Sequence, residues 1–143
     1  MARILIIEDA DDERESLRES LICAGHQVCC AQHGKAALPL LREWHVEVVI
    51  TDMLMPEMDG VETIINLRRD YPNLKIIAVS GLRGAVPDIY LRLARNLGAH
   101  VVLPKPFTTD EIVEAIQALS RDSSVGSSES GERDGRNTTV GDE

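Results

Sequence analysis

The sequence predicts an α/β fold in which five parallel β-strands form one sheet with helices on both faces. Short runs of Ile, Val, Leu and Ala alternate five times with segments whose apolar residues recur at helical spacing. These runs are apolar throughout, as is typical of strands buried on both faces. Hydrophobic residues make up 43% of the 143-residue chain and aromatic residues only 3%, which favours a core of small and branched side chains.

The first half of the chain supplies three strands and two helices. The strands are predicted at Arg3–Ile7, Gln27–Ala31 and Val46–Thr51. The helices between them have apolar stripes that consist of Leu17, Leu21 and Ala24 in the first, and of Ala37, Leu40, Leu41 and Trp44 in the second. Because residues three or four apart share one face of a helix, each stripe predicts a helix packed against the sheet.

The second half continues the alternation. The two remaining strands are predicted at Lys75–Ser80 and His100–Leu103. The stripes of the remaining three helices consist of Val61, Ile64, Ile65 and Leu67, of Leu93, Ala94 and Leu97, and of Ile112, Ala115, Ile116 and Leu119. Gly98 is a suitable C-terminal stop for the fourth helix, and Thr108 and Glu111 have the spacing of a capping box at the start of the fifth.

Short connections and right-handed crossovers leave few ways to arrange five such βα units. The favoured arrangement is the flavodoxin-like (βα)5 three-layer sandwich with strand order 2-1-3-4-5. We expect one folded domain at residues 1–120. Residues 121–143 are rich in Ser, Gly and acidic residues and contain two Val as their only large apolar residues, so we expect a disordered tail there.

Charge and cysteine content restrict the partners and the compartment. The formal net charge is −9 without clusters of Lys or Arg, which argues against direct contact with nucleic acid or an anionic membrane. The three cysteines lack metal-ligand spacing and are expected to be reduced thiols. No signal peptide or membrane-spanning run is visible, so a cytoplasmic location is expected.

Polar residues with reactive side chains stand where the predicted strands end. Glu8 and Asp9 follow the first strand, Asp52 follows the third, Ser80 ends the fourth and Lys105 comes shortly after the fifth. Ligands of open parallel sheets bind at the carboxyl ends of the strands. We therefore expect three carboxylates, a hydroxyl and an ammonium at one edge of the sheet.

This set of groups suits phosphoryl transfer assisted by Mg²⁺. Clustered carboxylates repel one another, and a hard divalent cation relieves the repulsion. Lys105 and the Ser80 hydroxyl would stabilise the remaining phosphoryl oxygens. A central carboxylate would act as the nucleophile and form an acyl phosphate.

The residues in question resemble the receiver domain of two-component response regulators. The resemblance covers residues 3 to about 120. Its motifs are Ile4-Leu5-Ile6-Ile7-Glu8-Asp9, Val48-Val49-Ile50-Thr51-Asp52-Met53-Leu54-Met55-Pro56-Glu57-Met58-Asp59-Gly60, Ile76-Ile77-Ala78-Val79-Ser80-Gly81 and Pro104-Lys105-Pro106-Phe107.

The resemblance implies that Asp52 is the phosphoacceptor, with a histidine kinase, a phosphotransfer protein or a small phosphodonor as the source of the phosphoryl group. It implies that Asp9, Asp52 and the backbone carbonyl of Leu54 bind Mg²⁺, with Glu8 acting largely through water.

The resemblance further implies that Ser80 moves to bond the phosphate, that Lys105 pairs with it and that the Lys105–Pro106 bond is cis. Such a change would repack the edge formed by the fourth helix, the fifth strand and the fifth helix. The family often has an aromatic residue at the position of Val102, so the output surface here is expected to switch without the usual rotation of that ring.

The sequence disfavours three other functions. A haloacid-dehalogenase-like phosphatase needs a second Asp two residues after the nucleophile, where this chain has Leu54. A flavodoxin-like FMN binder needs a Ser/Thr/Gly-rich loop after the first strand, where the acids beginning at Glu8 would repel the phosphate. A pseudo-receiver that serves only as a docking module would be marked by loss of Asp9 or Lys105, and both are present.

We therefore expect a stand-alone receiver. It would catalyse its own phosphorylation and dephosphorylation without being a turnover enzyme. Met1 lies close to the first strand, which favours a natural start, and no effector domain follows. The output would be a changed interaction with a downstream protein effector.

Overall fold

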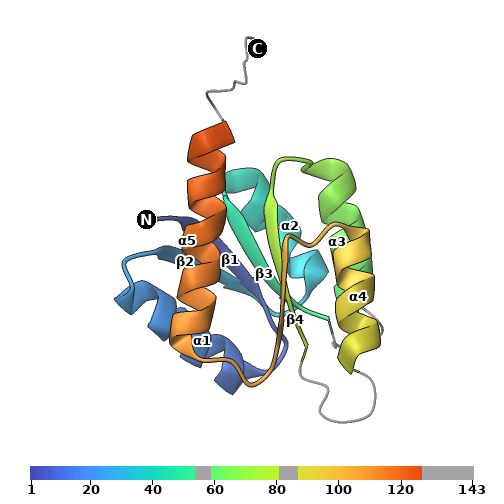
Figure 1. The fold of residues 1–143 in the computed structure, drawn as a ribbon, viewed down its shortest axis with the longest axis horizontal. Helices are drawn as coiled ribbons and strands as arrows, with labels where there is room; N and C mark the ends of the chain where they lie inside the picture. The colour runs from blue at the N-terminus through green and yellow to red at the C-terminus, as the bar shows by residue number, and fades with distance from the viewer. Residues whose placement is uncertain (54–58, 81–86, 127–143) are drawn as a thin grey trace. The chain divides into compact units, whose positions relative to one another are not determined.

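The computed structural model describes residues 1–53, 59–80 and 87–126 (Figure 1). Strands and helices alternate along the chain as predicted. The strands are β1 (Arg3–Ile7), β2 (Gln27–Ala31), β3 (Val48–Asp52), β4 (Lys75–Ser80) and β5 (Val101–Pro104). The helices are α1 (Asp11–Cys23), α2 (Gly34–Glu43), α3 (Asp59–Asp70), α4 (Pro87–Leu97) and α5 (Thr109–Gly126).

The five strands form one parallel sheet in the order β2-β1-β3-β4-β5, which confirms the predicted flavodoxin-like topology. The register pairs Ile4 of β1 with Val48 of β3, and Ser80 of β4 with Pro104 of β5. Because all strands run in the same direction, their carboxyl ends lie along one edge.

Three elements have boundaries that differ from the prediction. β3 begins two residues later than Val46 and includes Asp52, and β5 is shifted by one residue so that it includes Pro104. Pro104 lacks an N–H, and it is tolerated at the end of the last strand in the sheet order because one missing donor there interrupts no central ladder. α5 continues to Gly126, past the expected domain end at residue 120. Residues 127–143, the rest of the expected tail, lie outside the described residues.

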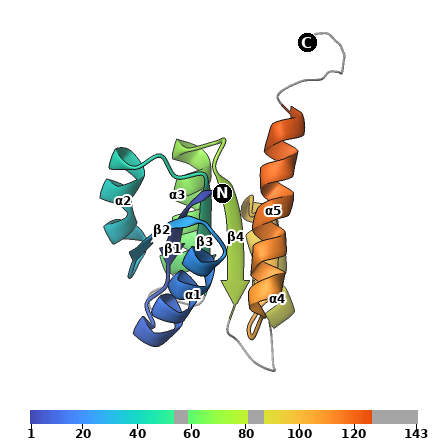
Figure 2. The same cartoon turned by 90° about the vertical axis from the view of Figure 1, so that its left-hand side faces the viewer.

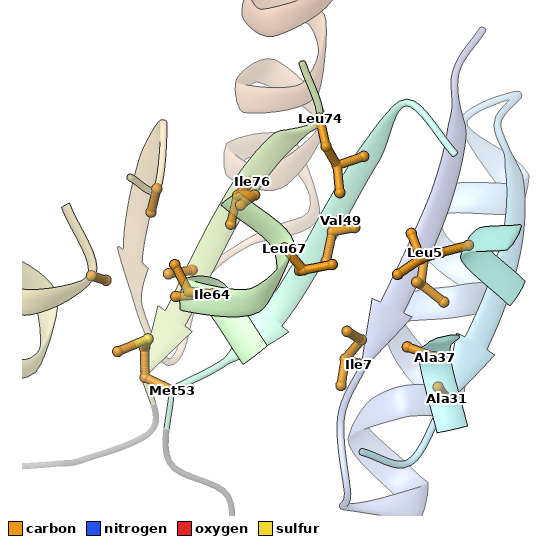
Figure 3. Close-up of a cluster of buried hydrophobic side chains, with 14 residues drawn as sticks. Leu5, Ile7, Ala31, Ala37, Val49, Met53, Ile64, Leu67, Leu74 and Ile76 are labelled. Atoms are coloured by element: carbon orange, nitrogen blue, oxygen red, sulfur yellow. The ribbon is translucent and has the colours of Figure 1, made fainter. Parts of the chain in front are cut away.

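A hydrophobic cluster fills one side of the sheet (Figure 3). Leu5, Ile7 and Val49 contribute from the strands, and Ile64 and Leu67 contribute from α3. Alternate residues of a strand point to the same face, so these strand side chains all face the layer of helices that contains α3. α2 and α3 lie side by side in this layer, as Figures 1 and 2 both show.

The opposite side of the sheet carries α1. Ile6 and Ile50, which alternate with the residues of the cluster, line a pocket together with Leu17 of α1. Leu21, the buried residue of α1, is absent from the cluster on the first side. The sheet is therefore covered on both faces, as the apolar strand sequences require.

The sheet, α1 to α4 and the start of α5 belong to one compact unit, Met1–Val113, and a second unit begins at Glu114. The predicted capping box is present at the start of α5. The hydroxyl of Thr108 accepts a hydrogen bond from the N–H of Glu111 at 3.1 Å, and the Glu111 carboxylate accepts one from the N–H of Thr108 at 2.8 Å. In the described part of the chain no helix has the length and apolar character needed to cross a bilayer.

Candidate functional site

The predicted site residues occupy the carboxyl ends of four neighbouring strands. Glu8 follows β1 directly, Asp52 and Ser80 are the last residues of β3 and β4, and Lys105 follows β5. Backbone hydrogen bonds continue past the ends of the strands and fix these positions. The N–H of Lys105 donates to the carbonyl of Ser80 at 2.7 Å, and the N–H of Met53 donates to the carbonyl of Val79 at 2.8 Å.

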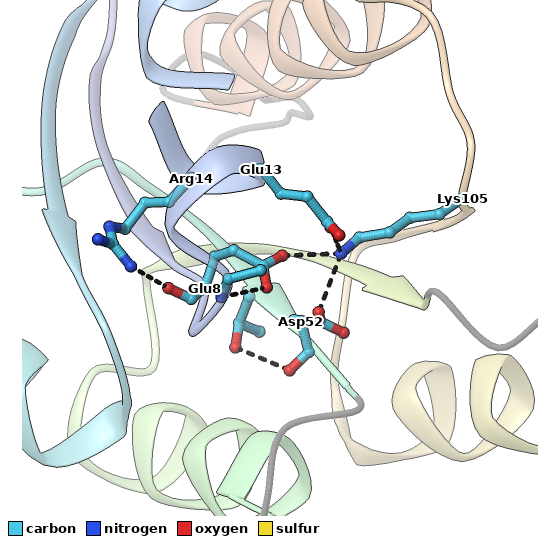
Figure 4. A network of polar contacts seen from close by, with 7 residues as sticks. Glu8, Glu13, Arg14, Asp52 and Lys105 are labelled. Carbon is cyan, nitrogen blue, oxygen red and sulfur yellow. Dashed lines mark hydrogen bonds and ion pairs between the residues drawn. The ribbon is translucent and has the colours of Figure 1, made fainter. Parts of the chain in front are cut away.

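The ammonium of Lys105 lies at the centre of three carboxylates (Figure 4). Its Nζ donates to Oε1 of Glu8 at 2.7 Å, to Oδ2 of Asp52 at 3.0 Å and to Oε1 of Glu13. The side chains of Glu8 and Asp52 are 7% and 6% exposed, whereas that of Glu13 is 57% exposed. Two of the partners of Lys105 are therefore buried strand-end acids, and the third lies on the solvent side.

Burial shapes the electrostatics of Glu8. Removal from water, with a smaller contribution from the charge of Asp52, raises the pKa of Glu8 to about 7 against the opposing hydrogen bond from Lys105. Oε2 of Glu8, the oxygen that does not contact Lys105, accepts a hydrogen bond from the N–H of Ala10 at 3.2 Å. The guanidinium of Arg14 donates to the Glu8 carbonyl at 2.9 Å, which holds the turn between β1 and α1 in place.

The pKa of Lys105 is also raised, but for a lysine this shift favours the charged form. Burial alone would lower its pKa, but the hydrogen bonds to Glu13, Glu8 and Asp52 outweigh burial and raise the pKa above its ordinary value. The lysine is therefore a permanent cation at the sheet edge. Its peptide bond to Pro106 is cis, as the resemblance implies.

Glu13 was not predicted as a site residue. It belongs to the acidic first turn of α1, where Asp11, Asp12 and Glu13 favour the positive end of the helix dipole and indicate an ordinary helix start. The signal that would have identified it is geometric: helical side chains lean toward the N-terminus of the helix. A long side chain in the first turn after β1 therefore reaches back over the ends of the strands.

The other predicted site residues differ in their exposure and in their contacts. Asp9 is exposed and lines the same pocket as Glu8 and Lys105. Ser80 is 1% exposed, and its carbonyl is tied to the backbone of Lys105. The direct contacts of the ammonium are with Glu8, Asp52 and Glu13. Leu54, whose carbonyl was predicted as a metal ligand, lies outside the described residues.

The donor groups fit a hard divalent cation. Among the described residues, one set of carboxylate oxygens gathers within 4.8 Å of one another, and it comes from Glu8, Glu13 and Asp52. Carboxylate oxygens without sulfur or imidazole suit Mg²⁺ and related hard ions rather than Zn²⁺. Glu8 and Asp52 are both buried, and the one positive charge of Lys105 does not equal the charge of two ionised acids, which adds a reason for a cation.

Gly60 allows α3 to begin against the end of β3. A Cβ atom at this position would lie 2.7 Å from the Cα of Met53 and would also collide with the carbonyl of Asp52. The helix therefore reaches the backbone of Asp52 only because residue 60 has no side chain. This contact fixes the end of β3, from which the Asp52 carboxylate extends.

Comparisons with known proteins bear on the family and on the fold. Residues 4–117 match the family model described as the response regulator receiver domain. The chain is 37% identical over 119 residues to the response regulator MprA of Mycolicibacterium vanbaalenii, a match that covers 83% of this chain and 50% of that protein.

Among solved structures, the crystal structure of a response regulator receiver domain protein from Clostridium thermocellum has a TM-score of 0.78 at 27% identity and covers 87% of this chain and 98% of that one. The chemotaxis protein CheY4 of Vibrio cholerae has a TM-score of 0.74 at 26% identity, over 83% and 98% of the two chains. The chain spans about half the length of the curated relatives it matches.

A family model that covers most of the chain, relatives above 30% identity and a shared fold all lead to one assignment. The chain belongs to the response regulator receiver domain family, whose members are phosphoacceptor switches of two-component systems.

Proposed function

We propose that Asp52 accepts a phosphoryl group from a histidine kinase or a phosphotransfer protein in a Mg²⁺-dependent reaction. The observation that carries this proposal is the Lys105 ammonium in direct contact with the buried carboxylates of Asp52 and Glu8 at the sheet edge. A carboxylate at this place is held in position and has a fixed cation beside it. These are the requirements for a nucleophile that receives an anionic group.

In the proposed reaction, a carboxylate oxygen of Asp52 attacks the phosphorus of the donor. The bond between phosphorus and the donor histidine nitrogen breaks, and its electron pair leaves with the imidazole. The product is an acyl phosphate on Asp52. Lys105 stabilises the charge that spreads over the phosphoryl oxygens in the loose transition state.

Asp9, Asp52 and the backbone carbonyl of Leu54 would hold Mg²⁺, with Glu8 acting through water. When bound, the ion supplies positive charge shared by the carboxylate and the phosphoryl oxygens. The cluster of carboxylate oxygens supports the parts of this assignment that involve Asp52 and Glu8; its third member, Glu13, is not among the expected ligands. Burial raises the pKa of Glu8 to about 7, so part of the Glu8 population is protonated at neutral pH without the ion, and metal binding is expected to release protons.

The proposed output is a change of protein contact. Ser80 would move to bond the phosphoryl group, and the register pairs of β4 with β5 give that movement a direct route into β5. Val102, which pairs with Ala78 across these strands, packs against the hydrophobic cluster that contains Ala94 of α4. The partner is proposed to be a downstream protein that recognises β5, α4 and the start of α5, all within the unit Met1–Val113.

The domain is proposed to act as a switch rather than as a turnover enzyme. Its folded part was expected at residues 1–120, and α5 continues beyond that end to Gly126. The chain spans about half the length of the curated relatives, so the proposed switch is a property of residues 1–143 alone. Cys23, Cys29 and Cys30 are free thiols, which supports a reducing, cytoplasmic compartment.

The proposal is tested by incubating the protein with Mg²⁺ and phosphoramidate and measuring phosphoryl incorporation by intact mass. Asp52→Asn should abolish incorporation, because an amide does not attack phosphorus. Asp70→Asn, which makes the same change on the exposed end of α3, should be labelled like the unmodified protein. Equal labelling of Asp52→Asn would place the acceptor elsewhere.

A further inference from the structure

The Lys105 ammonium has no hydrogen-bond capacity left for a phosphoryl oxygen. A lysine ammonium carries three N–H donors, and the structure assigns one each to Glu8, Asp52 and Glu13. If the proposed function holds, Lys105 must turn toward the phosphoryl group once Asp52 is modified. One of its present partners must then be given up.

The three partners are not equally easy to displace. Glu8 extends from a strand end and is more than nine-tenths buried, so it would lose its cation without regaining water. Asp52 carries the phosphoryl group once it is modified, so the ammonium must stay beside it. Glu13 extends from the first turn of α1, and its side chain is 57% exposed. Its carboxylate returns to solvent when the contact with Lys105 breaks, so its release is the least unfavourable of the three.

We infer that Glu13 is a built-in competitor for Lys105: its carboxylate occupies the ammonium in the unphosphorylated state and is displaced by the phosphoryl group. This inference rests on the proposed function and adds a positioning residue to it. Glu13 acts through Lys105 by holding it away from an incoming anion. The expected consequence is a slower gain of phosphate than the other site residues would allow.

Two variants separate the direct contact between Glu13 and Lys105 from a general effect of negative charge near the site. Asp12 precedes Glu13 in the same turn of α1, is exposed and carries the same charge. Asp12→Asn therefore removes one negative charge near the site without removing a contact of Lys105. Glu13→Asp keeps the charge and shortens the side chain by one methylene, which withdraws the carboxylate from the ammonium.

The test measures the initial rate of Asp52 phosphorylation by phosphoramidate with saturating Mg²⁺ in four proteins: unmodified, Glu13→Gln, Glu13→Asp and Asp12→Asn. We expect both Glu13 variants to be phosphorylated roughly two- to fivefold faster, the factor that corresponds to an exposed ion pair. Asp12→Asn should stay close to the unmodified rate. Midpoints of urea unfolding, measured in parallel, should change little in all three variants.

Each other result has a defined meaning. A rate in Glu13→Gln that is equal to or below the unmodified rate would overturn the inference while leaving phosphorylation of Asp52 intact. Equal gains in Glu13→Gln and Asp12→Asn, with Glu13→Asp unchanged, would replace competition for Lys105 with a simple effect of net charge. Failure of the unmodified protein to take up phosphate would instead overturn the proposed function, and this inference with it.

Discussion

At the scale of single residues, the negative charge of the carboxylates at the sheet edge is partly compensated by one ammonium, that of Lys105. Lys105 is 16% exposed and compensates Glu8 and Asp52, both of which are almost completely removed from water. Taking one partner from a buried ion pair leaves an uncompensated charge, and this usually costs more than the pair contributes. Lys105 is therefore expected to support folding as well as phosphoryl transfer.

Replacing Lys105 by Met keeps most of the side-chain volume and removes the charge. We expect Lys105→Met to lower the free energy of unfolding by about 3 kcal/mol at neutral pH without metal, as measured by urea denaturation. Lys35→Met, on the exposed surface of α2, serves as the control and should have little effect. Equal stability of the two variants would contradict the compensating role of Lys105.

The pH dependence of this loss has a definite sign. The folded-state pKa of Glu8 is raised from 4.5 to about 7, so protonated Glu8 favours the folded state; this contribution is complete below pH 4.5 and is lost as the pH rises through 7. Without Lys105, the ionised form of Glu8 becomes still less favourable. The destabilisation in Lys105→Met should therefore be larger at pH 8 than at pH 5.

At the scale of elements, the sequence contained most of what positions the site. Continuous apolar runs predicted the five strands, and a run that ends in a carboxylate, such as the one before Asp52, placed a reactive group at the sheet edge. The end of α5 was less predictable, because Ser and Gly are poor helix formers in isolation. Extending an existing helix adds a hydrogen bond for each residue fixed, so α5 continues through them to Gly126.

Gly60 links two elements to the position of Asp52. In Gly60→Ala the new methyl group would meet the backbone of Asp52 and Met53 rather than a flexible side chain, so α3 or the end of β3 must move. We expect a loss of about 1–3 kcal/mol in the free energy of unfolding and slower phosphorylation of Asp52 by phosphoramidate. Asn66→Ala, at an exposed position of α3, is the control for effects of alanine in the helix itself. A Gly60→Ala protein that matches it in both measurements would show that the close contact is unimportant.

At the scale of the whole molecule, topology explains why some site residues could be predicted from the sequence and Glu13 could not. Parallel strands bring their ends to one edge whatever the details of packing, so Glu8, Asp52, Ser80 and Lys105 followed from their order in the chain. The contact of Glu13 depends on the orientation of α1 and on the length of one side chain, which sequence spacing does not determine. The lengths of the relatives were likewise not visible in a single sequence.

The same topology predicts how a conformational change that begins at a phosphorylated Asp52 would spread. Ser80 pairs with Pro104, its carbonyl accepts from the N–H of Lys105 at 2.7 Å, and Ala78 pairs with Val102 two residues earlier, so movement at the end of β4 displaces β5. Phosphate favours one state only by its differential contacts with the two states.

With Mg²⁺ and beryllofluoride, a phosphate mimic, backbone NMR shifts should change at Ser80 and Lys105 and extend to Val102. Ser80→Ala should still bind the mimic at Asp52 and lose the change at Val102, while Asp52→Asn, or fluoride without beryllium, should show neither effect. Shifts that never leave the β1–α1 turn would mean that β4 and β5 do not carry the signal, and the output surface would then have to be sought on the α1 side of the sheet.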